Sequence, residues 1–523
     1  MKKIILLYIL AVGMIACTER NVPDNGSGNG SGTDTTTVSP GDTTITTTDT
    51  IRITWNSASA VIEGTHADVT VSEDKGYVTV NSTVKDITYI LSGEGQGQLT
   101  IYGTNRHQLI LNNLTLTCSD GPAINNQCKK SCFVVLEGTN SLTDGSSYAS
   151  SDEDRKAAFF SEGQMIFSGG GSLTVNGNYK HAIASDDYIQ FAASTGVLTL
   201  TAENDGIHAN DGIYFDGGGF NITAGNDGVQ CDSIIVVNKG VLFIIATDKG
   251  IVDSLGITIN GGTIRVSSAY KCIKTKADLV INGGDIEVAC TGAASSGGGG
   301  PWGGSSSSSP EAIEAKGTIT VNGGTVFAQS ADDAINSGGD MTINDGYVCA
   351  YSTGNDGLDA NGNLYIKGGL VYAIGASSPE VAIDANTEKG KKLYITGGTI
   401  IAIGNLESGA SISGGTCKYT SSWDGSQWYA LYDGNELVTA FKTPTKSSSS
   451  GTIWYGPGPG GGGPGGGGNS NQKLVVYTSS TPSLKSGVTV SGGATIFNGM
   501  VNPSATVSGG SNVTLSAYSN SGW

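Results

Sequence analysis

The sequence predicts an all-β protein, most of which folds as a parallel β-helix with an N-terminal cap and a small C-terminal β extension. Three observations lead to this prediction. Short apolar strands recur at intervals of about 22 residues. Apolar and polar residues alternate inside them, which is the period of β-strands. Glycine supplies 81 of the 523 residues, about twice its ordinary share of about 7%.

The repeat is marked by glycines that precede the apolar strands. They are Gly196, Gly218, Gly240, Gly262 and Gly284, followed after an insertion by Gly324, Gly346, Gly369 and Gly398. A unit of this length is too short for a propeller blade and lacks the helix of a leucine-rich or ankyrin repeat. One unit cannot bury its apolar residues alone, whereas stacked coils can. We therefore expect ten or eleven coils, with right-handed winding as the usual sense for parallel crossovers.

Three apolar positions recur in each unit and predict the core. Successive members are Ile207 and Val229 in the first column, Phe215 and Val237 in the second, and Phe220 and Leu242 in the third. Because neighbouring coils pair at about 4.8 Å, equivalent residues are expected to stack in ladders.

The N-terminus predicts export. Lys2 and Lys3 precede an apolar run that is too short to span a bilayer, as in a secretory signal. The run ends at Ala16, and residues 1–16 resemble a bacterial lipoprotein signal with Cys17 as the lipid-modified residue. We expect an outer-membrane or cell-surface lipoprotein that contacts the membrane only through this anchor.

Composition divides the rest of the chain. The predicted parts are a Thr/Ser/Gly tether (17–50), the β-helix (51–445) with a Gly/Ser-rich loop (292–309), a Gly/Pro-rich linker (446–472) and a C-terminal β segment (473–523). Most of the remaining cysteines are expected to be buried thiols. A disulfide between Cys128 and either Cys132 or Cys118 stays open.

The net charge excludes some classes of binding partner. The chain has 28 Lys and Arg against 46 Asp and Glu, a net charge of −18, which argues against nucleic acid and anionic lipid surfaces. Its four His form no H-x-x-x-H pair, and C-x-x-C is absent from the sequence, so zinc has little support. Calcium, which takes carboxylate and carbonyl oxygens, is the plausible metal.

Asn-Asp-Gly turns precede the first apolar column at residues 204–206, 226–228 and 355–357. Such residues tolerate the left-handed backbone of a corner, so a purely structural ladder is one interpretation. The other is calcium, because carboxylates one coil apart repel each other and a cation relieves that cost. The candidate ligands are Asp205, Asp211, Asp227, Asp333, Asp356 and Asp359, with Asp232 and Asp384 in nearby turns.

Lysines interrupt this acidic ladder in the middle of the repeat. They could pair with neighbouring aspartates, or they could form a basic patch for the carboxylates of uronic acids. Tyrosines in an outward-facing strand column offer a second carbohydrate signal, because sugar rings stack on aromatic faces. The candidate carbohydrate contacts are Lys249, Lys271, Lys274, Tyr214, Tyr365 and Trp302.

From about residue 51 to 415 the chain resembles a family of bacterial carbohydrate-binding β-helix proteins that look like polysaccharide lyases. The resemblance rests on the segment 109–116, the Asn-Asp-Gly turns, the Asn-Gly-Gly corners and the Gly-rich insertion around Pro301. It implies a right-handed parallel β-helix, bound calcium and binding of plant cell-wall glycans such as cellulose and polygalacturonate, without lyase activity. It also implies calcium at Asp205, Asp227 and Asp356.

We therefore expect a monomeric, surface-anchored polysaccharide-binding protein that uses calcium and performs no catalysis. The first alternative is a calcium-dependent polysaccharide lyase, for which Arg265, Lys249 and Lys271 are available as bases, although the sequence singles out no catalytic residue. The second alternative is a structural surface adhesin.

Overall fold

The computed structural model describes residues 44–47, 49–292, 309–445 and 472–519. Cys17, Trp302, the signal segment and most of the two Gly-rich interruptions lie outside these residues. None of the helices in the described ranges is long and apolar enough to cross a membrane.

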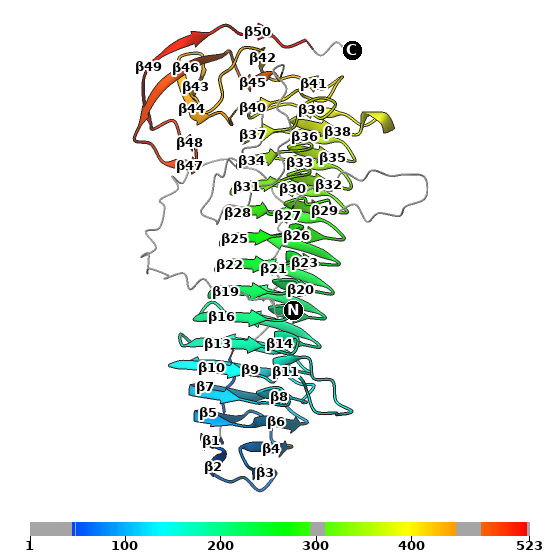
Figure 1. Cartoon of the computed structure of the whole chain (residues 1–523), viewed down its shortest axis with the longest axis vertical. Helices are drawn as coiled ribbons and strands as arrows, with labels where there is room; N and C mark the ends of the chain where they lie inside the picture. The colour runs from blue at the N-terminus through cyan, green and yellow to red at the C-terminus, as the bar shows by residue number, and fades with distance from the viewer. Residues whose placement is uncertain (1–43, 48, 293–308, 446–471, 520–523) are drawn as a thin grey trace, which may run out of the picture. The chain divides into compact units, whose positions relative to one another are not determined.

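The described chain forms a parallel β-solenoid of about 13 turns with coils of about 23 residues, and only 1% of it is helical. Figure 1 shows the coils stacked in sequence order. The predicted all-β parallel β-helix is confirmed. The solenoid has more turns than the expected ten or eleven.

Each regular coil contributes one strand to each of three ladders, and strands of successive coils pair in parallel. The first ladder is β4 (Tyr77–Ser82), β6 (Gln98–Gly103), β8 (Ile124–Asn126), β11 (Ala157–Ser161), β14 (His181–Ser185), β17 (Ile207–Ala209), β20 (Val229–Cys231), β23 (Lys249–Asp253), β26 (Lys271–Thr275), β29 (Ile313–Ala315), β32 (Ile335–Ser337), β35 (Leu358–Ala360) and β38 (Ile383–Ala385).

The second and third ladders belong to one large sheet. The second is β9 (Cys132–Glu137), β12 (Met165–Ser168), β15 (Tyr188–Phe191), β18 (Gly212–Phe215), β21 (Ile234–Val237), β24 (Gly256–Ile259), β27 (Leu279–Ile281), β30 (Ile319–Val321), β33 (Met341–Ile343), β36 (Leu364–Ile366), β39 (Leu393–Ile395) and β41 (Ser411–Ile412). The third is β10 (Thr139–Thr143), β13 (Ser172–Gly177), β16 (Val197–Ala202), β19 (Gly219–Ala224), β22 (Val241–Ala246), β25 (Thr263–Ser268), β28 (Asp285–Cys290), β31 (Thr325–Ser330), β34 (Tyr347–Ser352), β37 (Leu370–Ile374) and β40 (Thr399–Ile403).

Antiparallel strands cover the N-terminal end. Hairpins β1 (Thr50–Ser57) with β2 (Ser59–Glu63) and β3 (Val69–Asp74) with β4 precede the long strands β5 (Ile87–Gln96) and β7 (His107–Thr117), which pair in parallel. At the other end of the third ladder, β45 (Leu474–Thr478) runs antiparallel to β40 and also pairs with β42 (Thr416–Thr420), which pairs with β50 (Ser516–Ala517).

A six-stranded antiparallel sheet packs on the outer face of the last third-ladder strands. Its strands are β43 (Trp428–Asp433), β44 (Glu436–Lys442), β46 (Pro482–Ser491), β47 (Thr495–Phe497), β48 (Met500–Val501) and β49 (Thr506–Val513). Tyr372 and Ile401 of the solenoid share one apolar cluster with Tyr429 and Phe441 of this sheet. Residues 428–442 lie within the range predicted for the β-helix, but they pair here instead.

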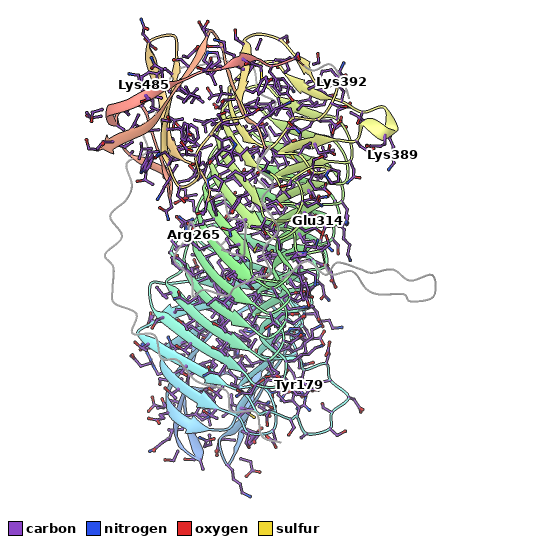
Figure 2. All side chains as sticks on the ribbon, turned by 45° about the horizontal axis from the view of Figure 1, so that its top comes forward. Tyr179, Arg265, Glu314, Lys389, Lys392 and Lys485 are labelled. Atoms are coloured by element: carbon purple, nitrogen blue, oxygen red, sulfur yellow. The ribbon has the colours of Figure 1, made fainter. Side chains whose placement is uncertain are left out.

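A single short helix occurs in the described residues. It is the 3₁₀-helix η1 (Thr387–Lys389), which is capped by Asn386 and by Gly390 in the left-handed conformation. Figure 2 shows Lys389 and Lys392 near this turn.

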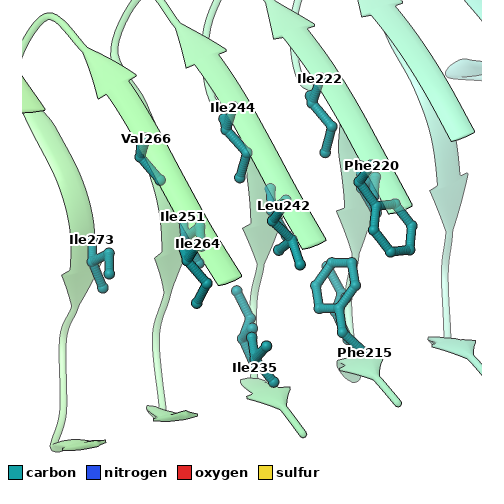
Figure 3. Packing of buried hydrophobic residues seen from close by; sticks show 14 of the residues in the cluster. Phe215, Phe220, Ile222, Ile235, Leu242, Ile244, Ile251, Ile264, Val266 and Ile273 are labelled. Carbon is teal, nitrogen blue, oxygen red and sulfur yellow. The ribbon is translucent and has the colours of Figure 1, made fainter. Parts of the chain in front are cut away.

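The core is made by the three predicted columns. Their members are all 2% exposed or less, for example Ile207, Phe215 and Phe220. Figure 3 shows Phe215 and Phe220 near Leu242 of the next coil. Burying each such side chain contributes about 1.5–3 kcal/mol, so the stack of coils supplies the stability that one coil lacks.

A corner glycine shows why the repeat needs this residue. Gly240 has φ +108°, and a Cβ there would lie 2.9 Å from the carbonyl oxygen of Gly217 in the preceding coil. Both the backbone conformation and the close approach exclude a side chain. The eight cysteines in the described residues are all free thiols, so neither of the disulfides left open by the sequence forms.

Candidate functional site

One position of the repeat carries a row of charged side chains that we call the charged ladder. It lies two residues before the first apolar column, and the parallel register places its members in successive coils. Its members are His181, Asp205, Asp227, Lys249, Lys271, Glu311, Asp333 and Asp356. All except the half-buried Lys249 are buried, so each charge needs a partner.

The lysines of the ladder obtain carboxylate partners. Lys249 Nζ lies 3.4 Å from Asp227 and also contacts Asp248. Lys271 Nζ contacts Glu311 and lies 3.4 Å from Glu314. This is the charge pairing that the sequence left open beside the basic-patch interpretation.

Lys274 belongs to the same ionic group. Its Nζ lies 3.2 Å from Glu314, which also contacts Lys316. Burial alone would raise the pKa of Glu314, but the contacts with Lys316, Lys271 and Lys274 outweigh it and hold the pKa at about 2. All three candidate lysines are therefore already occupied by carboxylates of this chain.

Arg265 forms a separate ion pair on β25. It lies 2.6 Å from Asp285 and 3.3 Å from Glu287. Figure 2 labels Arg265 and Glu314, which come from the third and the first ladder respectively.

Ladder aspartates bind the backbone of the next coil. Asp205 Oδ1 accepts a hydrogen bond from the N–H of Asp227 at 3.1 Å, and Asp227 Oδ1 accepts from the N–H of Lys249 at 3.0 Å. Asp333 Oδ1 accepts from the N–H of Asp356 at 3.1 Å. These bonds give the Asn-Asp-Gly turns the structural role that was the alternative to calcium.

The lower part of the ladder does not fit a calcium ion between Asp205 and Asp227. Asp205 Oδ1 also accepts from Asn226 Nδ2 at 2.8 Å, and its other oxygen faces His181 and His208. Asp227 is engaged by Lys249. Hydrogen-bond donors and an ammonium thus surround these carboxylates where calcium would require further oxygens.

Asp211 lies apart from these residues. It is exposed, and it follows β17 whereas Asp205 precedes that strand. The structure therefore does not bring these two candidate ligands together.

The upper end of the solenoid holds an acidic cluster, which we define as Asp356, Asp359 and Asp384. One oxygen from each carboxylate can lie within 4.8 Å of the others. Asp359 and Asp384 are register partners on β35 and β38. Asn336 Nδ2 links Asp359 to Asp333, at 2.7 Å and 3.0 Å. Among the described residues, no Lys, Arg or His forms an ion pair with the cluster.

Crowding changes the acidity of these groups. Burial, with nearby carboxylates, raises the pKa of Asp356 to about 7 and that of Asp359 to about 6. Burial and a hydrogen bond with Glu407 raise the pKa of Asp384 to about 10. Burial and the charge of Asp359 raise the pKa of Asp333 to about 8. Three converging carboxylates without a basic partner fit a hard divalent cation such as calcium.

The tyrosines separate into a buried and an accessible set. Tyr214 is 9% exposed and packs edge-on against Tyr188, so little of its ring is open to a ligand. Tyr365 and Tyr394 are partly exposed and stack with centroids 5.1 Å apart and planes 9° apart. Lys367 Nζ lies 5.6 Å from the centroid of the Tyr365 ring. We call Tyr365, Tyr394 and Lys367 the tyrosine platform.

A model of the family described as carbohydrate-binding domain-containing protein matches residues 73–357, which is more than half of the chain. The chain belongs to this family. The carbohydrate-binding domain contains the whole charged ladder, whereas the tyrosine platform and two members of the acidic cluster follow it in sequence.

One solved structure is also similar. It is titled a polysaccharide lyase-like protein from C. thermocellum, gadolinium derivative, and is 23% identical. The match covers 46% of this chain and 95% of that chain, with a TM-score of 0.38. No curated protein matches the chain.

Sequence reasoning did not select His181 or His208 as site residues. Aligning the repeats by their first apolar column would have placed His181 next to Asp205 in the charged ladder. The outward-facing tyrosine column expected from the sequence includes Tyr394 beside Tyr365, and the two are register partners.

Proposed function

We propose that this protein binds an acidic polysaccharide at the tyrosine platform, without catalysis, and that calcium at the acidic cluster stabilises the fold. The observation that carries the proposal is membership in a carbohydrate-binding family. Among the described residues that were predicted to contact carbohydrate, the tyrosine platform is where aromatic rings remain accessible.

The platform offers the groups that sugar recognition requires. The two phenol rings repeat at 5.1 Å, so their hydroxyls can meet successive sugars of an extended chain. On the far side of Tyr394 the register neighbour is Ser411, whose small side chain covers less of the ring than another tyrosine would. That ring face is available for stacking against a sugar. Lys367 supplies a cation for the carboxylate of a uronic acid.

The acidic cluster would hold calcium through Asp356, Asp359 and Asp384. When bound, calcium supplies the positive charge that the described side chains do not give to these carboxylates. Because Asp359 and Asp384 lie on neighbouring coils, their shared ligand would join β35 to β38.

Binding without turnover is supported by the state of the candidate bases. Lys249, Lys271 and Arg265 each contact a carboxylate of this chain, so all three candidate bases are already engaged. A lyase base must instead be free to accept a proton beside the substrate carboxylate.

We place the protein on the bacterial surface, attached through a lipid on Cys17. The support is the sequence pattern of two lysines, an apolar run and Ala16-Cys17. Labelling with a radioactive fatty acid tests the anchor, and Cys17→Ser should remain unlabelled.

Affinity electrophoresis of the full chain in gels containing polygalacturonate or hydroxyethylcellulose tests the proposed function. We expect retardation by polygalacturonate that Tyr394→Ala and Lys367→Ala reduce at least fivefold. Tyr270→Ala is the matched control because Tyr270 is 42% exposed and has no ring partner in the described residues.

Three outcomes contradict the proposal. Equal retardation of the Tyr394→Ala and Tyr270→Ala variants would place the site elsewhere. Absence of retardation by any polysaccharide would favour the adhesin alternative. Release of unsaturated products from polygalacturonate, seen by ultraviolet absorbance, would identify a lyase.

A further inference from the structure

Two histidines and an aspartate meet at the lower end of the charged ladder, away from the acidic cluster and the tyrosine platform. His181 begins β14, His208 lies on β17, and Asp205 precedes β17 by two residues. Neighbouring coils thus bring together two imidazoles whose separation in the sequence is much longer than that of the histidines in common zinc motifs.

The three donor atoms are spaced like the ligands of a small metal ion. Asp205 Oδ2 lies 3.1 Å from His181 Nδ1 and 3.2 Å from His208 Nδ1, and one ligand atom of each residue lies within 4.8 Å of the others. Ligands at about 2.0–2.1 Å around a tetrahedral zinc ion are roughly 3.3 Å apart. A modest side-chain adjustment is enough to form such a site.

The carboxylate is held in place by its other oxygen. Asp205 Oδ1 accepts hydrogen bonds from Asn226 Nδ2 at 2.8 Å and from the N–H of Asp227 at 3.1 Å. These bonds leave Oδ2 turned toward the histidines. Metal-binding carboxylates are oriented by outer hydrogen bonds of this kind.

Both ring nitrogens of the buried His181 lack a hydrogen-bond partner. Its ring is 1% exposed, and neither ring nitrogen makes a hydrogen bond of normal geometry. A buried polar atom left unpaired costs about 1–3 kcal/mol. A metal ion at Nδ1 would remove part of that cost.

The donor set is two imidazoles and a carboxylate, groups that bind metals in their neutral and ionised forms respectively. The side chain of His208 is 17% exposed and gives an ion a route from solvent.

We propose that His181, Asp205 and His208 bind one divalent transition-metal ion of the zinc, cobalt or nickel class, with water completing the coordination. Two nitrogen donors distinguish this site from the oxygen-only acidic cluster. The site links the coils of β14 and β17 independently of any glycan.

Metal titration of the chelator-treated full chain tests the site. We expect one equivalent of Co²⁺ to produce the intense visible bands of tetrahedral coordination, and Zn²⁺ to abolish them by competition. Isothermal titration with Zn²⁺ should show an affinity that His208→Gln weakens at least 100-fold. His208 is partly exposed, so this variant should keep the wild-type circular dichroism spectrum.

Two control variants sharpen the result. His66→Gln removes a surface histidine beside Asp68, and Asp359→Asn alters the acidic cluster. Both should keep the cobalt bands. Absence of tetrahedral bands in the wild type, or equal Zn²⁺ affinity of the His208→Gln and His66→Gln variants, would overturn the proposal. Glycan retardation is measured separately in chelator, so its failure leaves this result unaffected.

Discussion

Asn282 Nδ2 donates a hydrogen bond of 2.7 Å to Oδ1 of Asn260 in the preceding coil. The same bond recurs along the corner after the second ladder and forms a continuous amide ladder. Its members are Asn238, Asn260, Asn282, Asn322 and Asn344. Asp216 accepts the bond at its lower end, 2.7 Å from Asn238.

Removing one amide from this ladder should destabilise the protein. Asn282→Ala leaves Asn260 Oδ1 without its partner at a partly buried corner and also removes the bond from the exposed Asn322. We expect a loss of about 0.5–1.5 kcal/mol in the free energy of unfolding, measured by urea denaturation. Asn221→Ala, at an exposed strand position, is the control, and equal midpoints for the two variants would show that the ladder adds nothing.

Lys271→Met should lower the free energy of unfolding more than Asn282→Ala does. The substitution leaves the buried Glu311 without its ammonium partner, and Glu314 loses one of three. Breaking a buried ion pair from one side costs about 3–5 kcal/mol. Lys276→Met is the control because Lys276 Nζ bonds Ser254 Oγ at 3.2 Å and forms no ion pair in the part of the chain that the structure describes. Adding Glu311→Leu to Lys271→Met should recover part of the loss, and the absence of any recovery would contradict a charge-based cause.

The solenoid could be predicted from the sequence because two kinds of residue recur with its period: corner glycines and buried apolar side chains. A corner such as Gly240 admits no Cβ, and a core position such as Ile207 must be apolar, so both recur visibly. Strands 428–442 have no such period. Their pairing with residues after 472 depends on contacts between distant segments, so the sequence suggested the β-helix for them instead.

The candidate site was predicted less fully for a different reason. The sequence placed Asp205 and Asp356 at equivalent positions, and the fold keeps them equivalent. What distinguishes them is the surrounding coils: Asp205 faces two imidazoles, whereas Asp356 faces carboxylates. Spacing within one repeat unit does not contain that information, because the neighbours come from adjacent units.

Calcium removal should lower the melting temperature if the acidic cluster binds the ion. Calcium at 100 times its dissociation constant would add about 2.7 kcal/mol to the free energy of unfolding. Calorimetry in calcium and in chelator should therefore differ for the wild type. Asp359→Asn should reduce the difference, and Asp211→Asn, which alters an exposed carboxylate, should preserve it. Identical melting temperatures in both buffers would remove calcium from the proposal.

His107 should make the protein sensitive to acid. Burial lowers the pKa of His107 to about 4 from 6.5, so the folded state keeps this ring neutral. Between pH 6.5 and 4 the unfolded chain binds the proton and the native state does not, so stability falls as the pH decreases through this window. The shift corresponds to about 3 kcal/mol.

The test compares urea denaturation of the wild type and His107→Leu at pH 7 and pH 4. The wild type should lose more stability than the variant between these two pH values, by about 3 kcal/mol. His66→Leu, at a more exposed histidine, should behave like the wild type. Parallel pH profiles for the wild type and His107→Leu would show that His107 is protonated in the native state.

The reversed strands at the ends of the solenoid have a consequence for assembly. A bare parallel coil presents an unpaired strand edge onto which the first coil of another molecule could add, and repetition of that step would produce a filament. At the N-terminal end β2 and β3 run against the strands they cover, and at the other end β45 does so for the third ladder. The reversed strands therefore hinder axial addition of a second molecule at the edges that they cover.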